Sequence, residues 1–442
     1  MNRIPLALAI FASATAGAQG AAGPTGTNAF TGYAAVDSAV VARAAWRRAN
    51  AAMEAGDLAA ARAQVDRAAR AWPTQEVYAW GRVVMALRAN DTTGAIGALD
   101  AYADIGLGRD LAREPATRDL FKAPAFMAVA ARHEANRAPL IRGVPRVTLA
   151  DSSFWPEGMD YDPRTGAYYL ASIRHRTIAE WWPDGRVREL IPRGRAVLGA
   201  MLAVRVDTAR GVLWATTSGI PQQAGFQPAD SAVAALLRIR IADGTIERRW
   251  DLPVAPGGRV LGDVAIGPRG DVYLSDSQSP ELFRLGPGTD SLVVMRHPLF
   301  RSLQGVAPSS NPAVVYVADY SHGILRVDIG TKTVTRVADA PGSTTLGCDG
   351  IVFERSAIIA VQNGVIPPRV IRFTLDASGA SFSRAEVLDR NPAADEPTIG
   401  AIVGREFVYV ANSQWEKHDA AGVPRATAKL AGPVLLVLPI PR

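Results

Sequence analysis

The chain has 442 residues, of which 48% are hydrophobic, and 48 cationic and 42 acidic side chains give a formal charge of +6. Only four of the cationic residues are lysines, and no basic run is interleaved with exposed aromatic residues, so we expect no nucleic-acid partner. The single cysteine, Cys348, excludes an intramolecular disulfide, a CxxC redox pair and a cysteine-based zinc site. Burial of a hydrophobic core must therefore stabilise the fold, and the length suits one large and one smaller domain.

The first residues have the pattern of a secretory leader. Arg3 precedes an apolar run from Ile4 to Ala12, and residues 16–18 read Ala-Gly-Ala, a small-x-small sequence that suits signal peptidase. We therefore predict a signal peptide over 1–18, a linker over 19–33 and export to the periplasm or the outside of the cell. A short membrane anchor is the alternative, and the brevity of the run disfavours it. No later stretch reaches the roughly 18 apolar residues of a membrane span.

Residues 34–137 are alanine-rich and show helical spacing. Gly56 marks a turn between two helices, small residues then recur on one helical face, and Pro73 ends the second helix. This pattern resembles one tetratricopeptide unit, and residues 78–107 resemble a second, degraded one. A further helix is expected near 118–135. Two repeats are fewer than a free-standing solenoid needs, so we interpret the segment as a helical brace, with a groove for a protein partner as the alternative.

After Pro145 short β-branched and aromatic runs alternate with turn residues, which is typical of many short antiparallel strands. Six copies of a two-strand pattern align, and the position equivalent to Glu157 recurs at intervals of 45, 60, 42, 45 and 48 residues. These intervals are near the length of a four-stranded propeller blade. The fold class predicted for the chain is therefore mainly β: a six-bladed β-propeller over 145–442, preceded by a small tetratricopeptide-like α-helical domain.

The ends of the propeller sequence predict how the ring closes. The sixth copy leaves room for only one further strand, at residues 433–439, whereas residues 144–150 form an orphan strand before the first copy. Pairing these two strands would complete the last blade and remove an exposed sheet edge.

The topology of an up-and-down blade places the start of the first strand and the end of the second at the same end of the sheet. The residues that open the copies should therefore ring the mouth of the central channel, and those that close the second strands should form a wider ring. The inner ring consists of Glu157, Leu202, Gly262 with Asp263, Gln304, Asp349, and Pro397 with Thr398. The outer ring and the loops after it contain Ser172, His175, Ser218, Asp276, Asp319, His322, Asn363, Asn412 and His418.

Two interpretations apply to these polar residues. An Asp or Asn at a strand end is often a turn-former that bonds its own backbone. Convergence of several oxygen-bearing side chains on one channel mouth instead favours a hard cation such as calcium, which accepts six to eight oxygen ligands. Two carboxylates at one mouth would repel each other without such a cation.

Several blade phrases carry a resemblance to a known family. "FWPEGMDYDP", "LQGVA", "CDGIVF" and "VYVAD" resemble regucalcin, gluconolactonase and luciferin-regenerating enzyme, and the resemblance extends over 145–442. It implies that one divalent cation, expected to be Ca²⁺, is held by a glutamate from the first blade, asparagines from the third and fourth, and an aspartate from the fifth. Glu157 and Asp349 match the two acidic ligands, Gln304 replaces the fourth-blade asparagine, and Gly262 replaces the third, with Asp263 one position along on the alternate face of the strand.

Two functions compete on this basis. The first is a metal-dependent hydrolase of lactones or related esters, in which Asp349 is both ligand and general base; no GxSxG motif occurs in the second half of the chain to support a serine hydrolase. The second is a non-catalytic propeller that binds a ligand or a partner protein at the mouth, with the helical segment as a brace. The matching acidic residues favour the first, and the altered third and fourth positions favour the second.

Overall fold

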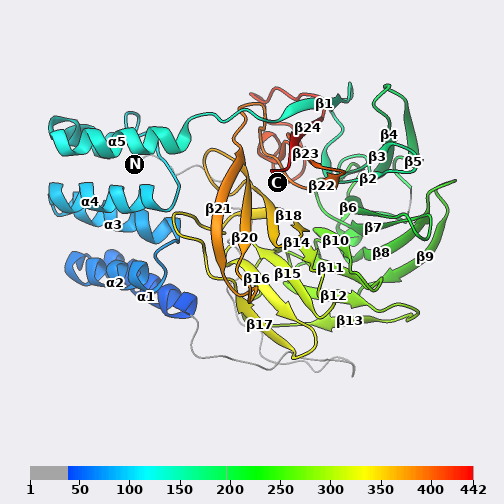
Figure 1. The fold of residues 1–442 in the computed structure, drawn as a ribbon, viewed down its shortest axis with the longest axis horizontal. Coiled ribbons are helices and arrows are strands. Elements are labelled where there is room, and N and C mark those ends of the chain that lie inside the picture. The colour runs from blue at the N-terminus through cyan, green and yellow to red at the C-terminus, as the bar shows by residue number, and fades with distance from the viewer. Residues whose placement is uncertain (1–37, 196, 442) are drawn as a thin grey trace.

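The computed structural model describes residues 38–195 and 197–441, in which a helical segment is followed by six four-stranded antiparallel sheets (Figure 1). The predicted signal peptide and linker lie outside the described residues. None of the described helices is long and apolar enough to cross a membrane. The propeller and the helical segment confirm the fold class that the sequence predicts.

Helical hairpins build the N-terminal segment. The helices are α1 (Ser38–Glu54), α2 (Leu58–Ala71), α3 (Glu76–Arg88), α4 (Thr92–Asp104) and α5 (Pro124–Arg137), with a 3-10 helix at Pro115–Lys122. Asp57 and Asp91 begin α2 and α4 by accepting hydrogen bonds from backbone N–H groups of the first turn at 2.9 and 2.8 Å, which satisfies donors that a helix start leaves unpaired. Gly56 has a φ of 74° in the turn before α2, a conformation that favours glycine.

Small side chains let these helices approach closely. Ala42 of α1 and Ala61 of α2 are fully buried, and α2 ends just before Pro73 as predicted. A Cβ on Gly81 of α3 would lie 2.8 Å from the ring of Trp46 on α1, so no larger residue fits there without movement of the ring. The alanine-rich composition of the segment is thus a consequence of tight helix packing.

In blades one to five the first strand lies at the channel and the last at the outer rim of the propeller (Figure 1). Blade one consists of β2 (Pro156–Asp162), β3 (Ala167–Ser172), β4 (Thr177–Trp181) and β5 (Val187–Ile191). Blade two consists of β6 (Ala200–Asp207), β7 (Val212–Ser218), β8 (Ala234–Arg240) and β9 (Ile246–Asp251). Blade three consists of β10 (Asp263–Ile266), β11 (Val272–Asp276), β12 (Glu281–Leu285) and β13 (Leu292–Met295). Blade four consists of β14 (Leu303–Pro308), β15 (Val314–Asp319), β16 (Gly323–Asp328) and β17 (Thr333–Arg336). Blade five consists of β18 (Cys348–Glu354), β19 (Ala357–Gln362), β20 (Arg369–Leu375) and β21 (Phe382–Asp389). Apolar side chains of adjacent blades interleave to form the core.

The sixth blade joins the two ends of the propeller sequence. Its strands are β22 (Gly400–Val403), β23 (Glu406–Val410), β24 (Val434–Pro439) and β1 (Val144–Thr148), in the order β1-β24-β23-β22 from rim to channel. Val147 of β1 lies opposite Leu435 of β24. This pairing confirms the predicted closure and leaves no gap in the ring.

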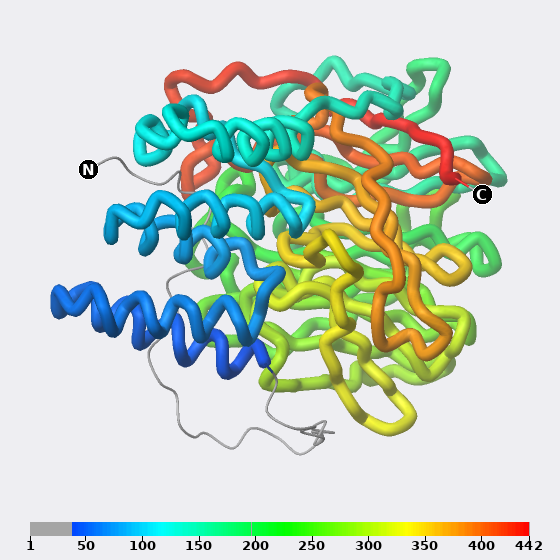
Figure 2. Tube along the Cα trace, turned by 60° about the vertical axis from the view of Figure 1, so that its left-hand side comes forward, coloured from blue at the N-terminus to red at the C-terminus, as the bar shows by residue number. Residues whose placement is uncertain are grey.

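The helical segment packs on the loops at the mouth end of blades four and five. The ring of Trp72 stacks on His322 with centroids 5.9 Å apart, and the guanidinium of Arg336 lies 5.0 Å from the Trp72 ring centroid. Arg369 donates a hydrogen bond to the Gly106 carbonyl at 2.7 Å. In Figure 2 the helices lie along one side of the propeller. These contacts support the interpretation as a brace, and a groove for a protein partner stays a prediction.

Candidate functional site

A β-bulge marks the start of the first strand in four blades. The bulged strand carries an extra residue that has no partner opposite it. In each case the register against the second strand shifts around an inner-ring residue, and these residues are Glu157, Leu202, Gln304 and Asp349. The same local irregularity therefore presents a side chain at the same level of four blades.

Glycines next to the bulge keep the mouth narrow. A Cβ on Gly158 would lie 2.4 Å from the carbonyl oxygen of Leu202 in the next blade, and one on Gly305 would lie 2.5 Å from that of Asp349. Gly350 similarly approaches the backbone of blade six. Adjacent first strands thus come together where only glycine fits, and the residue before each glycine lies at the mouth of the channel.

Glu157 is half-buried at this mouth. Its Oε2 accepts a hydrogen bond from the indole Nε1 of Trp415 at 2.8 Å. Burial raises the pKa of Glu157 well above its ordinary value, the charge of Asp349 raises it further, and the Trp415 hydrogen bond opposes both. The site therefore favours either a proton on Glu157 or a cation beside it.

Asp349 faces the same mouth from blade five. Burial raises the pKa of its carboxyl to about 7, and a hydrogen bond of 2.7 Å from Asn363 Nδ2 opposes that rise. Asn363 Nδ2 also donates to the Pro397 carbonyl at 2.9 Å, while the buried Asn363 Oδ1 has no hydrogen-bond partner. Asp349 and Asn363 together offer oxygens that the fold itself leaves unused.

Asp263 has a different role from the ligand role that the sequence predicts. Its carboxylate accepts hydrogen bonds from the backbone N–H groups of Val264 and Val306, both at 2.8 Å, and lies 3.8 Å from Arg205 Nη2. Burial raises the pKa of Asp263 to about 6, and the charge of Arg205 opposes this. Because backbone donors and an arginine already satisfy it, Asp263 links blades two, three and four instead of offering free oxygens to the mouth.

Gln304 extends toward the position of Gly262 in blade three. Its Oε1 lies 3.4 Å from the point that a Cβ on Gly262 would occupy, so the longer amide reaches toward blade three. Its Nε2 donates to Ser302 Oγ at 3.3 Å, so Oε1 is the amide atom that lies nearer to Gly262.

Three of the outer-ring residues bond the backbone of nearby loops. Asp276 Oδ1 accepts three backbone hydrogen bonds of 3.0 to 3.1 Å, and its other oxygen pairs with Arg259 at 2.7 Å. Asp319 accepts four backbone hydrogen bonds of 2.6 to 3.1 Å. Asn412 bonds the backbone of its own long loop on both sides of its amide, at 2.7 and 3.0 Å. These three side chains therefore hold loops, which agrees with the interpretation of strand-end Asp and Asn residues as turn-formers.

Among the described residues, none of the three predicted histidines is hydrogen-bonded to an inner-ring carboxylate, and His418 Nδ1 lies 2.9 Å from the Gln414 carbonyl oxygen. His175 Nε2 lies 3.1 Å from Ser153 Oγ and 3.3 Å from Asp151 Oδ2, in the loop before blade one. Burial lowers the pKa of His175. His322 is only 1% exposed because Trp72 of the helical segment covers it. Strand counting placed these loops at the mouth end correctly but could not show what covers them.

Two residues that the sequence did not single out complete the mouth. Glu396, one position before the sixth-blade ring residue, has a φ of 68°, which is uncommon for a residue other than glycine. Burial raises the pKa of Glu396 to about 8, and its Oε2 accepts a hydrogen bond from the Glu416 N–H at 3.0 Å. Trp415 comes from the loop 411–433 between β23 and β24. The Glu-Pro dipeptide that opens the sixth copy could have indicated Glu396 from the sequence. No local sequence pattern indicates Trp415.

The donor set fits a hard cation only if amide oxygens take part. Within residues 38–195 and 197–441 no group of three or more His, Cys, Asp or Glu side chains is arranged to hold a metal ion. The available oxygens are those of Glu157 and Asp349, the unpartnered Oδ1 of Asn363, and Oε1 of Gln304. An oxygen-only set of carboxylates and amides is of the kind that calcium accepts.

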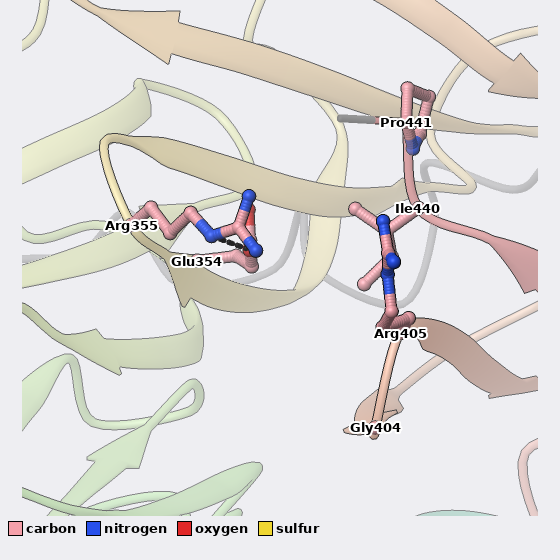
Figure 3. Close-up of a pocket in the computed structure, with 6 residues that line it drawn as sticks. All are labelled: Glu354, Arg355, Gly404, Arg405, Ile440 and Pro441. Carbon is pink, nitrogen blue, oxygen red and sulfur yellow. Dashed lines mark ion pairs between the residues drawn. The ribbon is translucent and has the colours of Figure 1, made fainter.

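The opposite end of the propeller carries a small pocket. A pocket of about 20 Å³ lies there between blades five and six, lined by Glu354 and Arg355 of one turn and by Gly404, Arg405, Ile440 and Pro441 (Figure 3). Glu354 and Arg355 form an ion pair with each other at 3.0 Å. A space of this size holds about one water molecule.

Comparison with known proteins gives likeness in fold alone. No protein-family profile matches the sequence, and no curated protein does. Similar solved structures include a gluconolactonase from Xanthomonas campestris, with 18% identity over 70% of this chain and 93% of that chain and a TM-score of 0.44. A calcium-binding regucalcin from Agrobacterium tumefaciens has 14% identity over 69% of this chain and 100% of that chain, with a TM-score of 0.44. A luciferin-regenerating enzyme has 12% identity over 68% and 95%, with a TM-score of 0.45.

Proposed function

We propose that the channel mouth hydrolyses lactones or related esters with the help of a divalent cation. The oxygen donors of the site favour Ca²⁺ as that cation. The observation that carries the proposal is the pair Glu157 and Asp349. These half-buried carboxyl groups come from blades one and five, burial raises the pKa of both, and the charge of Asp349 raises the pKa of Glu157 further. A cation between such groups relieves the repulsion, and this is the arrangement that metal-binding carboxylates share.

Glu157, Asp349 and the amide oxygens of Asn363 and Gln304 would hold the cation. A divalent cation at this position supplies Lewis acidity, which polarises a carbonyl oxygen and lowers the pKa of bound water. Trp415 fixes one oxygen of Glu157 by its hydrogen bond of 2.8 Å, and Asn363 fixes one oxygen of Asp349 at 2.7 Å. The second oxygen of each carboxylate would then be available to the cation.

Asp349 is suited to act as the general base. Burial raises the pKa of Asp349 to about 7 in the chain without a cation, and a bound cation would favour the ionised carboxylate, which is the form that accepts a proton. Leu202 and the indoles of Trp155 and Trp415 belong to an apolar cluster beside Glu157. An ester would then have its ring against this apolar cluster and its carbonyl toward the carboxylates.

The second candidate is a propeller that binds a ligand without catalysis. The observation that favours it is the absence of three clustered acidic or imidazole ligands among the described residues, because two carboxylates alone hold calcium weakly. In this alternative the hydrogen bond from Trp415 and a proton would satisfy Glu157 without a metal.

Metal analysis of the purified protein together with a lactone screen separates the two candidates. We expect about one equivalent of calcium, hydrolysis of at least one lactone, loss of hydrolysis on chelation and its return when calcium is added. Hydrolysis that survives full chelation would contradict the metal role. A protein that binds neither calcium nor other divalent ions, and opens no lactone, would leave the binding propeller as the function.

A further inference from the structure

An open, charged cavity lies next to the mouth, and the loop 411–433 forms most of its wall. Its volume is about 430 Å³, and its lining includes Asp395, Glu396, Glu416, Lys417, Arg425 and Lys429. Glu396 belongs to both places, because its charge also acts on Glu157 at the mouth. A molecule with one end at the carboxylates could therefore extend its other end into this cavity.

The loop that forms the cavity wall is anchored across the mouth. Trp415 bonds Glu157 at 2.8 Å, and the ring of His418 stacks on Trp155 with centroids 4.0 Å apart. Farther along, the Gln222 side-chain amide donates to the Ala420 carbonyl at 3.3 Å. Contacts with blades one and two thus hold a loop that begins and ends in blade six, and they place its charged residues at a defined distance from the site.

The charges in this cavity are not all paired with each other. Lys417 pairs with Asp395 at 2.8 Å. Arg425 uses Nε to bond the Glu416 carbonyl at 2.9 Å, which leaves its two terminal amino groups for another acceptor. Among the described residues, no carboxylate lies within ion-pair distance of Arg425 or Lys429. Two exposed cationic groups without a carboxylate partner therefore line an open cavity of ligand size.

The distribution of lysine points to the same place. The chain has four lysines among 48 cationic residues, and two of them, Lys417 and Lys429, line this one cavity. An ammonium group is a compact point charge that binds carboxylate or phosphate oxygens, and the neighbouring guanidinium can bind two oxygens of one group.

We propose that this cavity is a subsite for a negatively charged group on the substrate, so that the preferred substrate is a lactone or ester that carries a carboxylate. Arg425 and Lys429 bind that carboxylate while the scissile carbonyl lies at Glu157 and Asp349. Lys417, which Asp395 already neutralises, orders the wall of the cavity. The inference deepens the proposed function and rests on it for the reaction, but the binding of an anion can be tested without any reaction.

The direct test is calorimetric titration of the full chain with malonate and, separately, with malonamide, its uncharged analogue of similar size. Malonate is expected to bind and malonamide is not. Replacing Lys429 by Ala, alone and together with Arg425→Gln, should weaken malonate binding by about tenfold or more, as expected for the loss of charge-assisted hydrogen bonds. Equal binding of the two probes, or unchanged malonate binding in the double variant, would overturn the subsite.

A variant that should strengthen malonate binding controls for the possibility that weaker binding in the other variants reflects a loss of structure. Glu416→Gln removes a negative charge from the cavity lining and keeps the backbone N–H that bonds Glu396. This variant should bind malonate more tightly than the wild type. Lys332→Ala removes an exposed lysine at the opposite end of blade four and should change nothing. Weaker binding in Glu416→Gln, or an equal loss in Lys332→Ala, would contradict the proposal.

Kinetics then connect the subsite to the reaction. For a lactone that carries a carboxylate, Lys429→Ala should raise KM several-fold with little change in kcat, and for the same lactone with a primary carboxamide it should change neither. If no lactone is opened, the proposed function fails while the malonate result still decides the subsite. If lactones are opened but the charged and uncharged ones respond alike to Lys429→Ala, the subsite fails and the hydrolase stands.

Discussion

The inner and outer rings of the mouth carry the same types of side chain but use their oxygens differently. Asp319 in the outer ring accepts four backbone hydrogen bonds, and its pKa is lowered. Asp349 in the inner ring has one side-chain donor, and burial raises its pKa to about 7. A carboxylate that its own loop satisfies stabilises the fold, whereas one that burial leaves poorly satisfied is available for a proton, a cation or a substrate.

The largest expected effect comes from breaking the inner ring. Replacing Asp349 by Asn should lower kcat/KM for a lactone by about 1000-fold, because the general base and a charged ligand are lost together. Glu157→Gln should weaken calcium binding and lower activity in the same direction. Steady-state kinetics and calcium titration measure both variants. Glu354→Gln, at the other end of the same strand β18, is the matched control, and comparable losses in it would remove the basis for assigning the site to the mouth.

The outer ring should respond in stability. Asp319→Ala leaves four backbone N–H groups without their acceptor, and each unsatisfied buried donor costs about 1 to 3 kcal/mol. We therefore expect a loss of about 3 kcal/mol or more in the free energy of unfolding, measured by urea denaturation. Asp349→Asn should be neutral or stabilising, because it removes a carboxyl group that burial disfavours in its charged form. An Asp319→Ala protein as stable as the wild type would show that the two rings do not differ in this way.

The pH dependence of stability should distinguish the rings further. The pKa of Asp349 is raised in the folded chain to about 7, so between pH 4 and 7 the folded state binds more protons at this site than the unfolded state does. Its contribution to stability is thus present at low pH and is lost as the pH rises through about 7. Urea unfolding at several pH values should show wild type losing stability relative to Asp349→Asn across this window. Saturating calcium should reverse the trend, because the cation favours the ionised carboxylate.

The smallest effect is expected at Trp415. Its indole donates to the charged form of Glu157 and so lowers the pKa of that carboxyl. Trp415→Phe removes the donor and keeps the ring, and calcium affinity at pH 7 should fall by about tenfold, the effect of one charge-assisted hydrogen bond. Trp250→Phe removes an indole hydrogen bond of 3.1 Å at the rim of blade two and is the control. Equal calcium affinities in Trp415→Phe and wild type would mean that the indole does not position Glu157.

Local patterns in the sequence were sufficient for the architecture. Strand alternation, turn residues and blade-length intervals predicted six blades, the orphan strand at Val147 predicted the closure, and the helical period predicted the hairpins before Pro73. The positions of Glu157 and Asp349 at the mouth also followed from strand counting. These features depend on residues near each other along the chain, or on a repeat that recurs in each blade, so the sequence by itself determines them.

Only the tertiary structure decided which oxygens are free. Asp263 and Asp349 both lie at the start of a first strand, yet Arg205 from another blade compensates the charge of Asp263. Trp415 bonds a glutamate 258 positions away in the sequence, and Trp72 of the helical segment covers His322. Satisfaction of a buried polar group depends on all the donors that folding brings within about 3 Å. Those donors come from distant blades and from a loop without a repeat, and no local pattern records them.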